Sequence, residues 1–348
     1  MKKFHQQGLS LLELMIALAL GLVLVAVAVQ MFISSQANLS LQRSLGDLQD
    51  NGLFGIEFIG KDLRKTNLGA ALPVIDANIA QGGIVFSNSN IVGNKNLVVE
   101  NINNYISLQS HPQSVSGFTG HQSDQLTIQY KAVQNIYDDA TFLRKINNSV
   151  QSDGTVDFGG QNTTVVGYDC EGRTITLKEV TEKTYIIQRY YVSLSNGSPA
   201  LYCDAGRYKL SELEDNAEGG STTKIIAIDG LGKNAQIVLR HVEHFRVLLG
   251  VMENGQTNNQ KYKYMPMPDA NNTVAQPQIP LVRSVKLGLM IRAQDRVTSN
   301  QLQDIEDFQI LDLSLAANLL DSTKTKHMRQ VLTQTIALRN GLGEDLRQ

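Results

Sequence analysis

Glu13 is the residue whose position most clearly predicts chemistry, because it is a carboxylate inside an apolar segment. From Leu9 to Ile33 the sequence contains no Lys, Arg or Asp, and Glu13 is the only acidic residue. An ionised side chain inside a membrane costs roughly 2.5–3.5 kcal/mol on insertion scales, so such residues usually have a function. The segment supplies no cation for this carboxylate. We therefore expect Glu13 to need a cationic partner from outside the segment.

The other candidate groups lack the spacing of a catalytic or metal site. His241 and His244 flank Glu243, but the local pattern predicts a strand, on which the two histidines would point to opposite faces. The segment Asp229–Lys233 lacks the spacing of a phosphate-binding loop, and Ser195 lacks the glycines that flank a catalytic serine. We therefore predict that the chain is not an enzyme and binds no cofactor or metal.

The composition limits the classes of protein that the chain can represent. Its 348 residues carry a formal net charge of −2, and 42% of them are hydrophobic. This hydrophobic content supports a folded core, and the near-neutral charge does not indicate nucleic-acid binding. Lys261 and Lys263 alternate with Tyr262 and Tyr264, a pattern that would also suit single-stranded nucleic acid. We favour a solvated strand or loop at these residues.

The two cysteines, Cys170 and Cys203, are too few for a zinc site made of four cysteines. Each lies just after a strand-like segment, and an oxidising compartment would allow the pair to form one disulfide. We predict this disulfide, and the alternative is a pair of buried free thiols.

The chain begins with a short basic peptide followed by an apolar segment that is long enough to span a membrane. Residues 1–8 include Lys2 and Lys3 and no acidic residue. Residues 9–33 would form a helix of roughly 37 Å, and a bilayer core is about 30 Å thick. Basic residues favour the cytoplasmic side, so residues 1–8 are expected there and the bulk of the chain outside. An ordinary secretory signal has a shorter apolar region followed by a clear small-residue cleavage site. This sequence has neither feature, so we do not expect an ordinary secretory signal.

Helical periodicity continues beyond the apolar segment. Residues 34–67 are expected to prolong the membrane helix as an amphipathic helix, giving a single helix from Ser10 to Asn67. Glycines in its outer half each lower helix stability by roughly 1 kcal/mol relative to alanine, so we predict a kink or break there. These glycines are Gly46, Gly52, Gly55 and Gly60. The apolar stripe consists of Leu41, Leu45, Leu48, Gly52, Ile56, Ile59 and Leu63.

Residues 68–348 are expected to form a β-rich globular domain, because short β-like segments alternate there with Asn, Gly and Ser clusters. Thr184–Val192 and Leu201–Cys203 are predicted to form a hairpin across the turn Ser195-Asn196-Gly197-Ser198. Polar loops are expected near residues 211–224 and 254–280. The other predicted strands are Leu97–Glu100, Tyr105–Leu108, Leu126–Lys131, Thr163–Tyr168, Thr174–Val180, Ile225–Ile228, Ile237–Leu239, Phe245–Val251, Val285–Arg292 and Phe308–Leu313.

The sequence Gly8-Leu9-Ser10-Leu11-Leu12-Glu13 resembles the class III signal of type IV prepilins and pseudopilins. The resemblance implies that a prepilin peptidase cleaves between Gly8 and Leu9 and methylates the new amine of Leu9. It also implies that Glu13 is the family's glutamate at the fifth position of the mature chain. Leu9 departs from the family's commonest first residues, which are Phe and Met.

Three shorter segments are similar to PilW minor pilins and to the J-type pseudopilins of type II secretion: Asp62–Arg64, His241–Gly250 and Thr335–Asn340. A fourth segment, Ser284–Arg292, is similar to PilW in particular. This resemblance implies an α+β fold, in which a long N-terminal transmembrane and amphipathic helix, the pilin stick, packs on a mainly antiparallel β globular domain. The length of the chain favours PilW over the J-type pseudopilins.

The resemblance implies a minor pilin that acts in initiation or assembly of a type IV pilus, possibly at its tip. The alternatives are a pseudopilin of a type II secretion system and a membrane-tethered periplasmic enzyme or binding module. The implied partners are prepilin peptidase, other minor pilins and the major pilin. The implied location is the bacterial inner membrane, with a cytoplasmic N-terminus and a periplasmic globular domain, and then the filament. In the filament, Glu13 would pair with the cleaved amine of a neighbouring subunit, which sets register more than it adds stability.

Overall fold

The fold was analysed in a computed structural model of the whole chain. The structure describes residues 10–93, 96–133, 165–213, 224–253, 261–269, 279–296, 306–320 and 327–342. The predicted leader, residues 1–8, and Leu9 lie outside these ranges. So do the first two residues of the predicted strand Thr163–Tyr168 and most of the two predicted loops.

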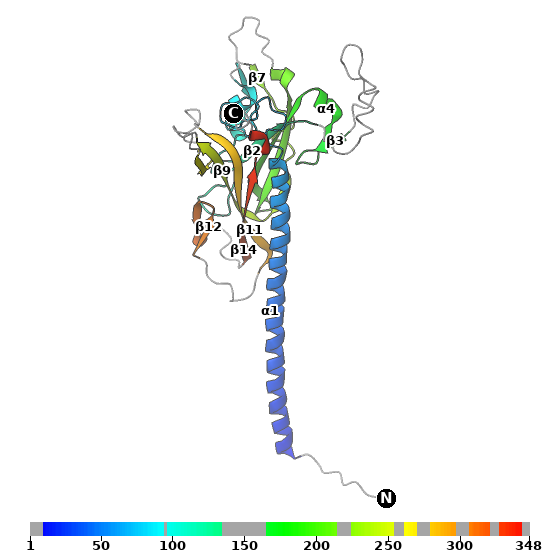
Figure 1. Cartoon of the computed structure of the whole chain (residues 1–348). Helices are drawn as coiled ribbons and strands as arrows, with labels where there is room; N and C mark the ends of the chain where they lie inside the picture. Colours follow the sequence, from blue (N-terminus) through cyan, green and yellow to red (C-terminus); the bar gives the residue numbers. More distant parts are fainter. Residues whose placement is uncertain are drawn as a thin grey trace.

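A single long helix, α1 (Leu11–Leu63), projects from a β-rich body. Its N-terminal end lies far from the body, and its C-terminal part is packed into it (Figure 1). Its first turn is closed by a capping box. The Ser10 hydroxyl accepts the Glu13 backbone N–H at 3.2 Å, and the Glu13 carboxylate accepts the Ser10 N–H at 3.4 Å. The most apolar part of the helix has a mean hydropathy of 2.7, none of it is buried, and it is long enough to cross a membrane. The predicted helix therefore extends about as far as expected, four residues short of Asn67.

The predicted kink is wrong, because α1 is continuous through all four glycines. Three of them lie where the helix touches a sheet. A Cβ atom on Gly52 would lie 2.3 Å from the Leu332 side chain, and one on Gly55 would lie 2.8 Å from Leu239. These glycines allow close approach between helix and sheet, and the packing gained offsets their low helix propensity.

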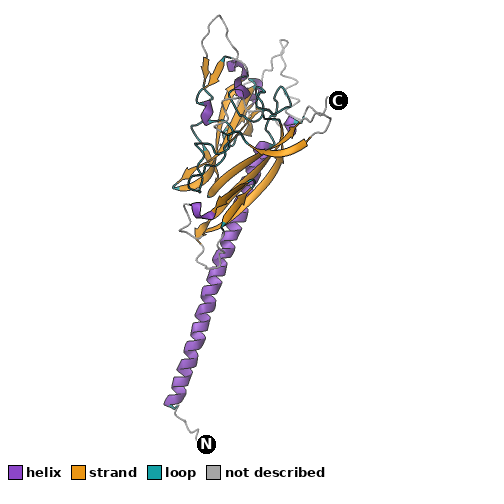
Figure 2. Ribbon diagram, turned by 90° about the vertical axis from the view of Figure 1, so that its left-hand side faces the viewer, coloured by secondary structure: helices purple, strands orange, loops and turns teal. Residues whose placement is uncertain are grey.

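The sheet under α1 has four antiparallel strands in the order β10-β9-β11-β14. These strands are β9 (Val242–Glu253), β10 (Lys261–Pro266), β11 (Leu281–Arg296) and β14 (His327–Ala337). The outer half of α1 packs across β11 and β14 (Figure 1). In the view of Figure 2 the helix runs up into the body, where strands overlap its upper turns.

A second antiparallel sheet has the strand order β2-β5-β6-β8. These strands are β2 (Leu126–Lys131), β5 (Thr184–Ser195), β6 (Ser198–Lys209) and β8 (Gln236–Arg240). The predicted hairpin is confirmed: Ser195 pairs with Ser198, and Asn196 and Gly197 both have positive φ angles, of 50° and 77°. An Asn-Gly turn of this kind matches the twist of the two strands that it joins.

Smaller elements complete the body. Three two-stranded sheets pair β1 (Leu97–Val99) with β7 (Lys224–Ile226), β3 (Val165–Tyr168) with β4 (Thr174–Thr176), and β12 (Asp307–Ile310) with β13 (Leu313–Ala316). The β1–β7 pair is parallel and the other two are antiparallel. The short helices are α2 (Ser89–Val92) and α4 (Leu177–Thr181), and the 3-10 turns are Ile102–Asn104, Leu210–Leu213, Ala317–Leu319 and Arg339–Gly341.

The α+β architecture with a mainly antiparallel body is confirmed, but several predicted strands need correction. Thr174–Val180 is strand only to Thr176, where a Thr176–Glu179 capping box starts α4. Phe308–Leu313 is not one strand: Phe308–Ile310 belongs to β12 and Leu313 begins β13. The turn between them includes Leu311, which has a φ of 57°. In Tyr105–Leu108, only Leu108 forms an isolated β-bridge.

One hydrophobic core joins α1 to both large sheets. The buried part of the stripe predicted on α1 is Leu48, Gly52, Ile56, Ile59 and Leu63, whereas Leu41 and Leu45 remain partly or largely exposed. Ser44 is the first buried residue of α1, so from Ser44 to its C-terminal end the helix forms part of the body.

Candidate assembly site

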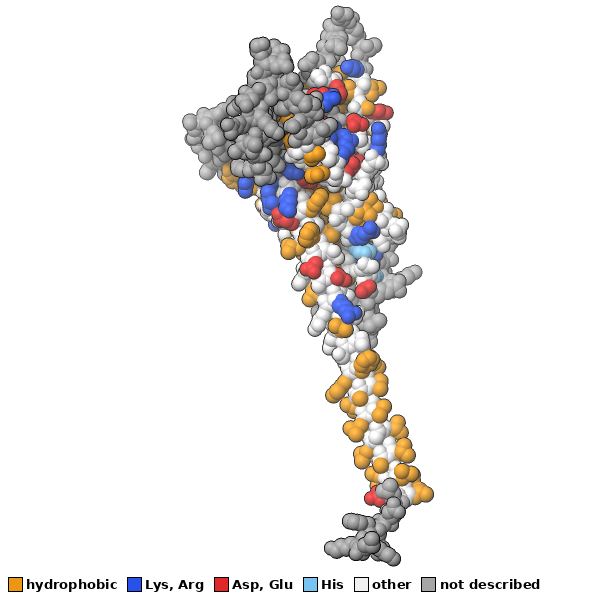
Figure 3. Space-filling model, turned by 90° about the vertical axis from the view of Figure 1, so that its right-hand side faces the viewer, with side chains coloured by type: hydrophobic (Ala, Val, Ile, Leu, Met, Phe, Trp, Pro, Cys, Tyr) orange, Lys and Arg blue, Asp and Glu red, His pale blue; other side chains and the backbone are white. Residues whose placement is uncertain are grey.

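From Leu14 to Ile33, the free half of α1 presents an apolar surface in which Gln30 is the one polar side chain. Large side chains on it are strongly exposed, such as Leu11 at 77%, Leu24 at 71% and Phe32 at 64%. Figure 3 shows this half of the stick covered by hydrophobic side chains, whereas charged side chains appear mainly on the body. An exposed apolar surface of this extent must be covered by lipid or by other protein.

Glu13 lies in the first helical turn at the outer end of this surface and is exposed. In the isolated chain its carboxylate accepts the N–H of Ser10 and caps its own helix. The negative charge is favourable near the positive end of the helix dipole. The pattern Ser-x-x-Glu would have identified this second role from the sequence. Gly8 and Leu9, the predicted cleavage residues, lie outside the described residues.

The C-terminal end of α1 is attached to the body by a buried polar contact. The Tyr190 hydroxyl of β5 donates to the Asp62 carboxylate at 2.6 Å, and Lys65 contacts the other oxygen of Asp62 at 2.8 Å. Burial raises the pKa of the Tyr190 phenol well above its usual value, with a further contribution from Asp62, so the hydroxyl keeps its proton and donates. This contact fixes the orientation of the helix relative to the second sheet.

Buried ion pairs hold distant segments of the body together. Arg246 on β9 contacts Asp124 at 3.2 Å and Asp312 at 2.7 Å. Asp124 also accepts the backbone N–H groups of Ser110 and Val247. Burial raises the pKa of Asp124 to about 6, although Arg246 and these hydrogen bonds lower it. Since the partners are 66 or more residues apart, no local sequence pattern indicated this cluster.

The two histidines considered as metal ligands serve structural roles. His244 lies in β9, where its Nδ1 lies 2.9 Å from the Ser116 hydroxyl, and burial lowers its pKa to about 3. His241 precedes β9 with a φ of 60°. Glu243 forms an ion pair with Arg329 at 2.8 Å. Over the described ranges, no three His, Cys, Asp or Glu side chains gather to bind a metal ion.

The other groups singled out in the sequence are also dispersed. Asp229 forms an exposed ion pair with Arg173, and Ser195 lies at the β5–β6 hairpin. Lys261 and Tyr262 belong to the edge strand β10, which lies inside the region predicted as a loop. Side chains of β10 are largely exposed, so this part of the prediction, a solvated strand, matches the structure.

Cys170 and Cys203 are joined by a disulfide with a Cα–Cα distance of 6.1 Å. The bond connects the turn after β3 to β6, and both residues are buried in the main core. It therefore ties the small β3–β4 sheet, which lies beside α1, to the second large sheet.

Thiol labelling tests this disulfide in the protein itself. Unfolded, unreduced chain is expected to show no reactive thiol, and reduction should release two. Loss of the bond, which closes a segment of 33 residues, should lower the free energy of unfolding by roughly 3–4 kcal/mol on the chain-entropy model. Two reactive thiols before reduction would instead show that the cysteines are free.

Comparison with known families decides what kind of protein presents this stick and body. A model of the prokaryotic N-terminal methylation motif matches residues 3–29, and a model described as Type IV Pilus-assembly protein W, or PilW, matches residues 189–340. The chain is a type IV pilin-like protein. In this pilin-like chain the first match spans most of the predicted leader and the first part of α1, and the PilW region extends from β5 to the 3-10 turn Arg339–Gly341.

Among solved structures, the pilin-like chain is similar to the type IV-like pilin TTHA1219 from Thermus thermophilus. The two are 12% identical with a TM-score of 0.32, and the match covers 84% of this chain and 96% of that one. At this TM-score the likeness adds nothing to the assignment, which rests on the two family models. None of the curated proteins matches the chain.

Proposed function

We propose that this pilin-like chain is a minor pilin that acts in initiation or assembly of a type IV pilus. Prepilin peptidase would cleave it after Gly8 and methylate Leu9. Before assembly the free half of α1 would lie in the inner membrane, with the body in the periplasm. Other minor pilins and the major pilin would then replace lipid around the helix.

The observation that carries this proposal is the division of α1 into two halves. From Ser44 onward one face of the helix is built into the core, whereas before it the large apolar side chains are exposed, apart from the half-buried Leu41. A protein that is only tethered to the membrane needs a membrane-spanning helix and no fixed geometry between that helix and its body. Here the span is rigidly continuous with a helix that is fixed to the body at Asp62, so helix packing between subunits would also set how the bodies are arranged.

Glu13 is proposed to act in assembly through its charge. Cleavage would create an amine at Leu9, and the amine of one subunit would pair with Glu13 of its neighbour. In a low-dielectric surrounding such a pair depends strongly on position, so it specifies register between subunits. Before assembly the same carboxylate would be held by the N–H of Ser10.

Replacing Glu13 separates the two roles of this carboxylate. Glutamine also satisfies a capping box, so Glu13→Gln keeps the helix cap and removes only the charge. We expect leader cleavage and the fold of the body to be unchanged in Glu13→Gln, Glu13→Ala and Glu13→Val. The amount of chain in sheared filaments should fall about tenfold or more in all three, as expected for the loss of at least ~1.4 kcal/mol.

Immunoblots of membrane and filament fractions, together with counts of pili per cell, would measure this effect. Assembly of Glu13→Gln at the wild-type level would show that the charge is not used. A defect in Ala and Val alone would assign the residue to helix capping.

A further inference from the structure

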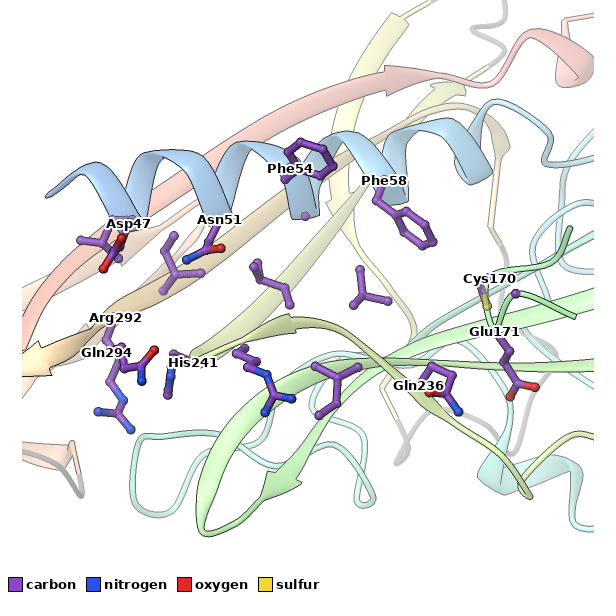
Figure 4. Close-up of a pocket in the computed structure, with 18 of the residues that line it drawn as sticks. Asp47, Asn51, Phe54, Phe58, Cys170, Glu171, Gln236, His241, Arg292 and Gln294 are labelled. Atoms are coloured by element: carbon purple, nitrogen blue, oxygen red, sulfur yellow. The ribbon is translucent and has the colours of Figure 1, made fainter. Parts of the chain in front are cut away.

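A groove of about 820 Å³ lies between the outer half of α1 and strand β8, and we refer to it as the α1–β8 groove. Asp47 to Phe58 of α1 form one wall, and Gln236–His241 form the other (Figure 4). The turn between β3 and β4 closes one end at Cys170 and Glu171, and the end of β11 closes the other at Arg292 and Gln294 (Figure 4).

The wall formed by β8 is an unpaired strand edge. β8 is the last strand of its sheet and pairs only with β6, and no other described segment forms backbone hydrogen bonds with it. All the consecutive residues Gln236–His241 line the groove, although successive side chains of a strand point to opposite faces. The groove therefore meets the strand at its edge. A free edge of this kind is a template for an added strand.

The facing wall carries large apolar side chains far from any lipid. Phe54 is 81% exposed and Phe58 is 39% exposed. Phe54 lies 21 residues beyond Ile33, which is roughly 32 Å further along the helix, so a bilayer that covers residues 9–33 does not reach it. Exposed aromatic side chains beside a pocket are typical anchors of protein interfaces.

Charged side chains at one end of the groove favour an occupant with complementary charges. Arg240 on β8 and Asp47 on α1 face the groove from opposite walls, and both are exposed. Neither forms an ion pair with any described residue. Beside them, Nδ1 of His241 is buried without a hydrogen-bond partner. A segment with an acidic and a basic side chain at this end would satisfy both walls.

Pairing of β8 with the same strand of a second copy of this chain does not fit. Two identical strand edges pair about a two-fold axis and therefore run antiparallel. Because α1 lies lengthwise beside β8 in Figure 4, this pairing would point the two membrane helices in opposite directions. Two copies in one membrane cannot meet in this way.

From the geometry we propose that the α1–β8 groove binds an extended segment of a different pilin-like subunit, which adds as a strand to β8. The segment is about five residues long, to match Gln236–Arg240. It places apolar side chains against Phe54 and Phe58, and an acidic and a basic residue beside Arg240 and Asp47. This inference rests on the proposed function, because the partner is a neighbour in the assembly.

Photo-crosslinking in filament-producing cells tests the groove with the full chain. A benzophenone amino acid replaces Phe54 in one variant and Tyr262 in its control. Tyr262 is an exposed aromatic residue on β10, on a different sheet. We expect Phe54 to give an adduct with another pilin-like subunit, and mass spectrometry should map it to an extended segment that Tyr262 does not reach.

A charge reversal provides the second measurement. Arg240→Glu is combined with the benzophenone amino acid at position 54. It should lower the adduct yield about tenfold or more, because the introduced carboxylate would face the acidic residue of the bound segment. The control Lys261→Glu, on exposed β10, should leave the yield unchanged. An equal effect of both substitutions would contradict recognition by the groove.

The remaining outcomes also decide the inference. An adduct with lipid, with a second copy or with a helical segment would overturn it, as would the absence of any Phe54 adduct. Filament fractions of the unsubstituted chain are assayed in parallel. If that chain is absent from filaments, the proposed function fails by itself, and the membrane-fraction adducts still decide whether the groove binds an extended segment.

Discussion

Gly8→Val is expected to leave the chain at its full length and to remove it almost completely from filaments. A side chain at Gly8 would crowd the bond to Leu9 in the cleft of the peptidase, whereas glycine allows close approach because it has no Cβ. Without cleavage, Lys2 and Lys3 stay attached and no amine forms at Leu9. Cleavage after Gly8 would remove both lysines and change the formal charge of the chain from −2 to −4, with 29 basic and 33 acidic residues remaining.

Intact-mass measurement of the purified chain would detect the retained leader directly. Gln7→Val is the matched control, because it adds a similar side chain one residue from the scissile bond and should be cleaved. Normal processing of Gly8→Val would refute cleavage after Gly8.

Gly55→Leu is expected to destabilise the body by roughly 1–3 kcal/mol or more, the usual cost of overpacking a core. A Cβ at this position would lie 2.8 Å from Cδ2 and 3.1 Å from Cβ of Leu239, so the helix would have to move off β8. Gly46→Leu provides the control in the same helix, because no atom lies within 4 Å of its added Cβ. There the gain in helix propensity should leave stability equal or higher by up to ~1 kcal/mol.

Urea unfolding of the full chain in detergent micelles would compare the two variants. The chain has 11 tyrosines and no tryptophan, so tyrosine fluorescence is the appropriate signal. Equal stability of Gly55→Leu and Gly46→Leu would contradict the packing role of Gly55.

The helical stick is predictable from the sequence because its signals are local. An apolar segment of membrane length, a periodic stripe and a basic leader all lie within the first 67 residues. The predicted kink failed for a physical reason: propensity scales treat a glycine in isolation, whereas Gly52 and Gly55 contact side chains about 180 residues or more away. Their packing partners, Leu332 and Leu239, are not recognisable from the sequence around the helix.

Strands with a buried apolar pattern were predictable, whereas the two outer strands of the sheet under α1 were not. β2 and the interior of β11 have strand-like apolar patterns, and both were placed correctly. β10 and β14 are edge strands with largely exposed or half-buried residues, so their sequences resemble loops. The unpaired edge of β8 was not foreseeable either, because β8 was predicted as a strand but its pairing with β6 was not.

The contact between α1 and the body also determines how the molecule carries mechanical load. The buried residues of the helix run from Ser44 to Leu63, about 28 Å along its axis. Tension applied at the apolar end acts parallel to this interface and loads its contacts in shear, so they resist together instead of opening one after another. The Asp62–Tyr190 hydrogen bond lies at the far end of the interface and shares this load with the apolar contacts. The body is therefore attached to its stick in the geometry that best withstands traction along a filament.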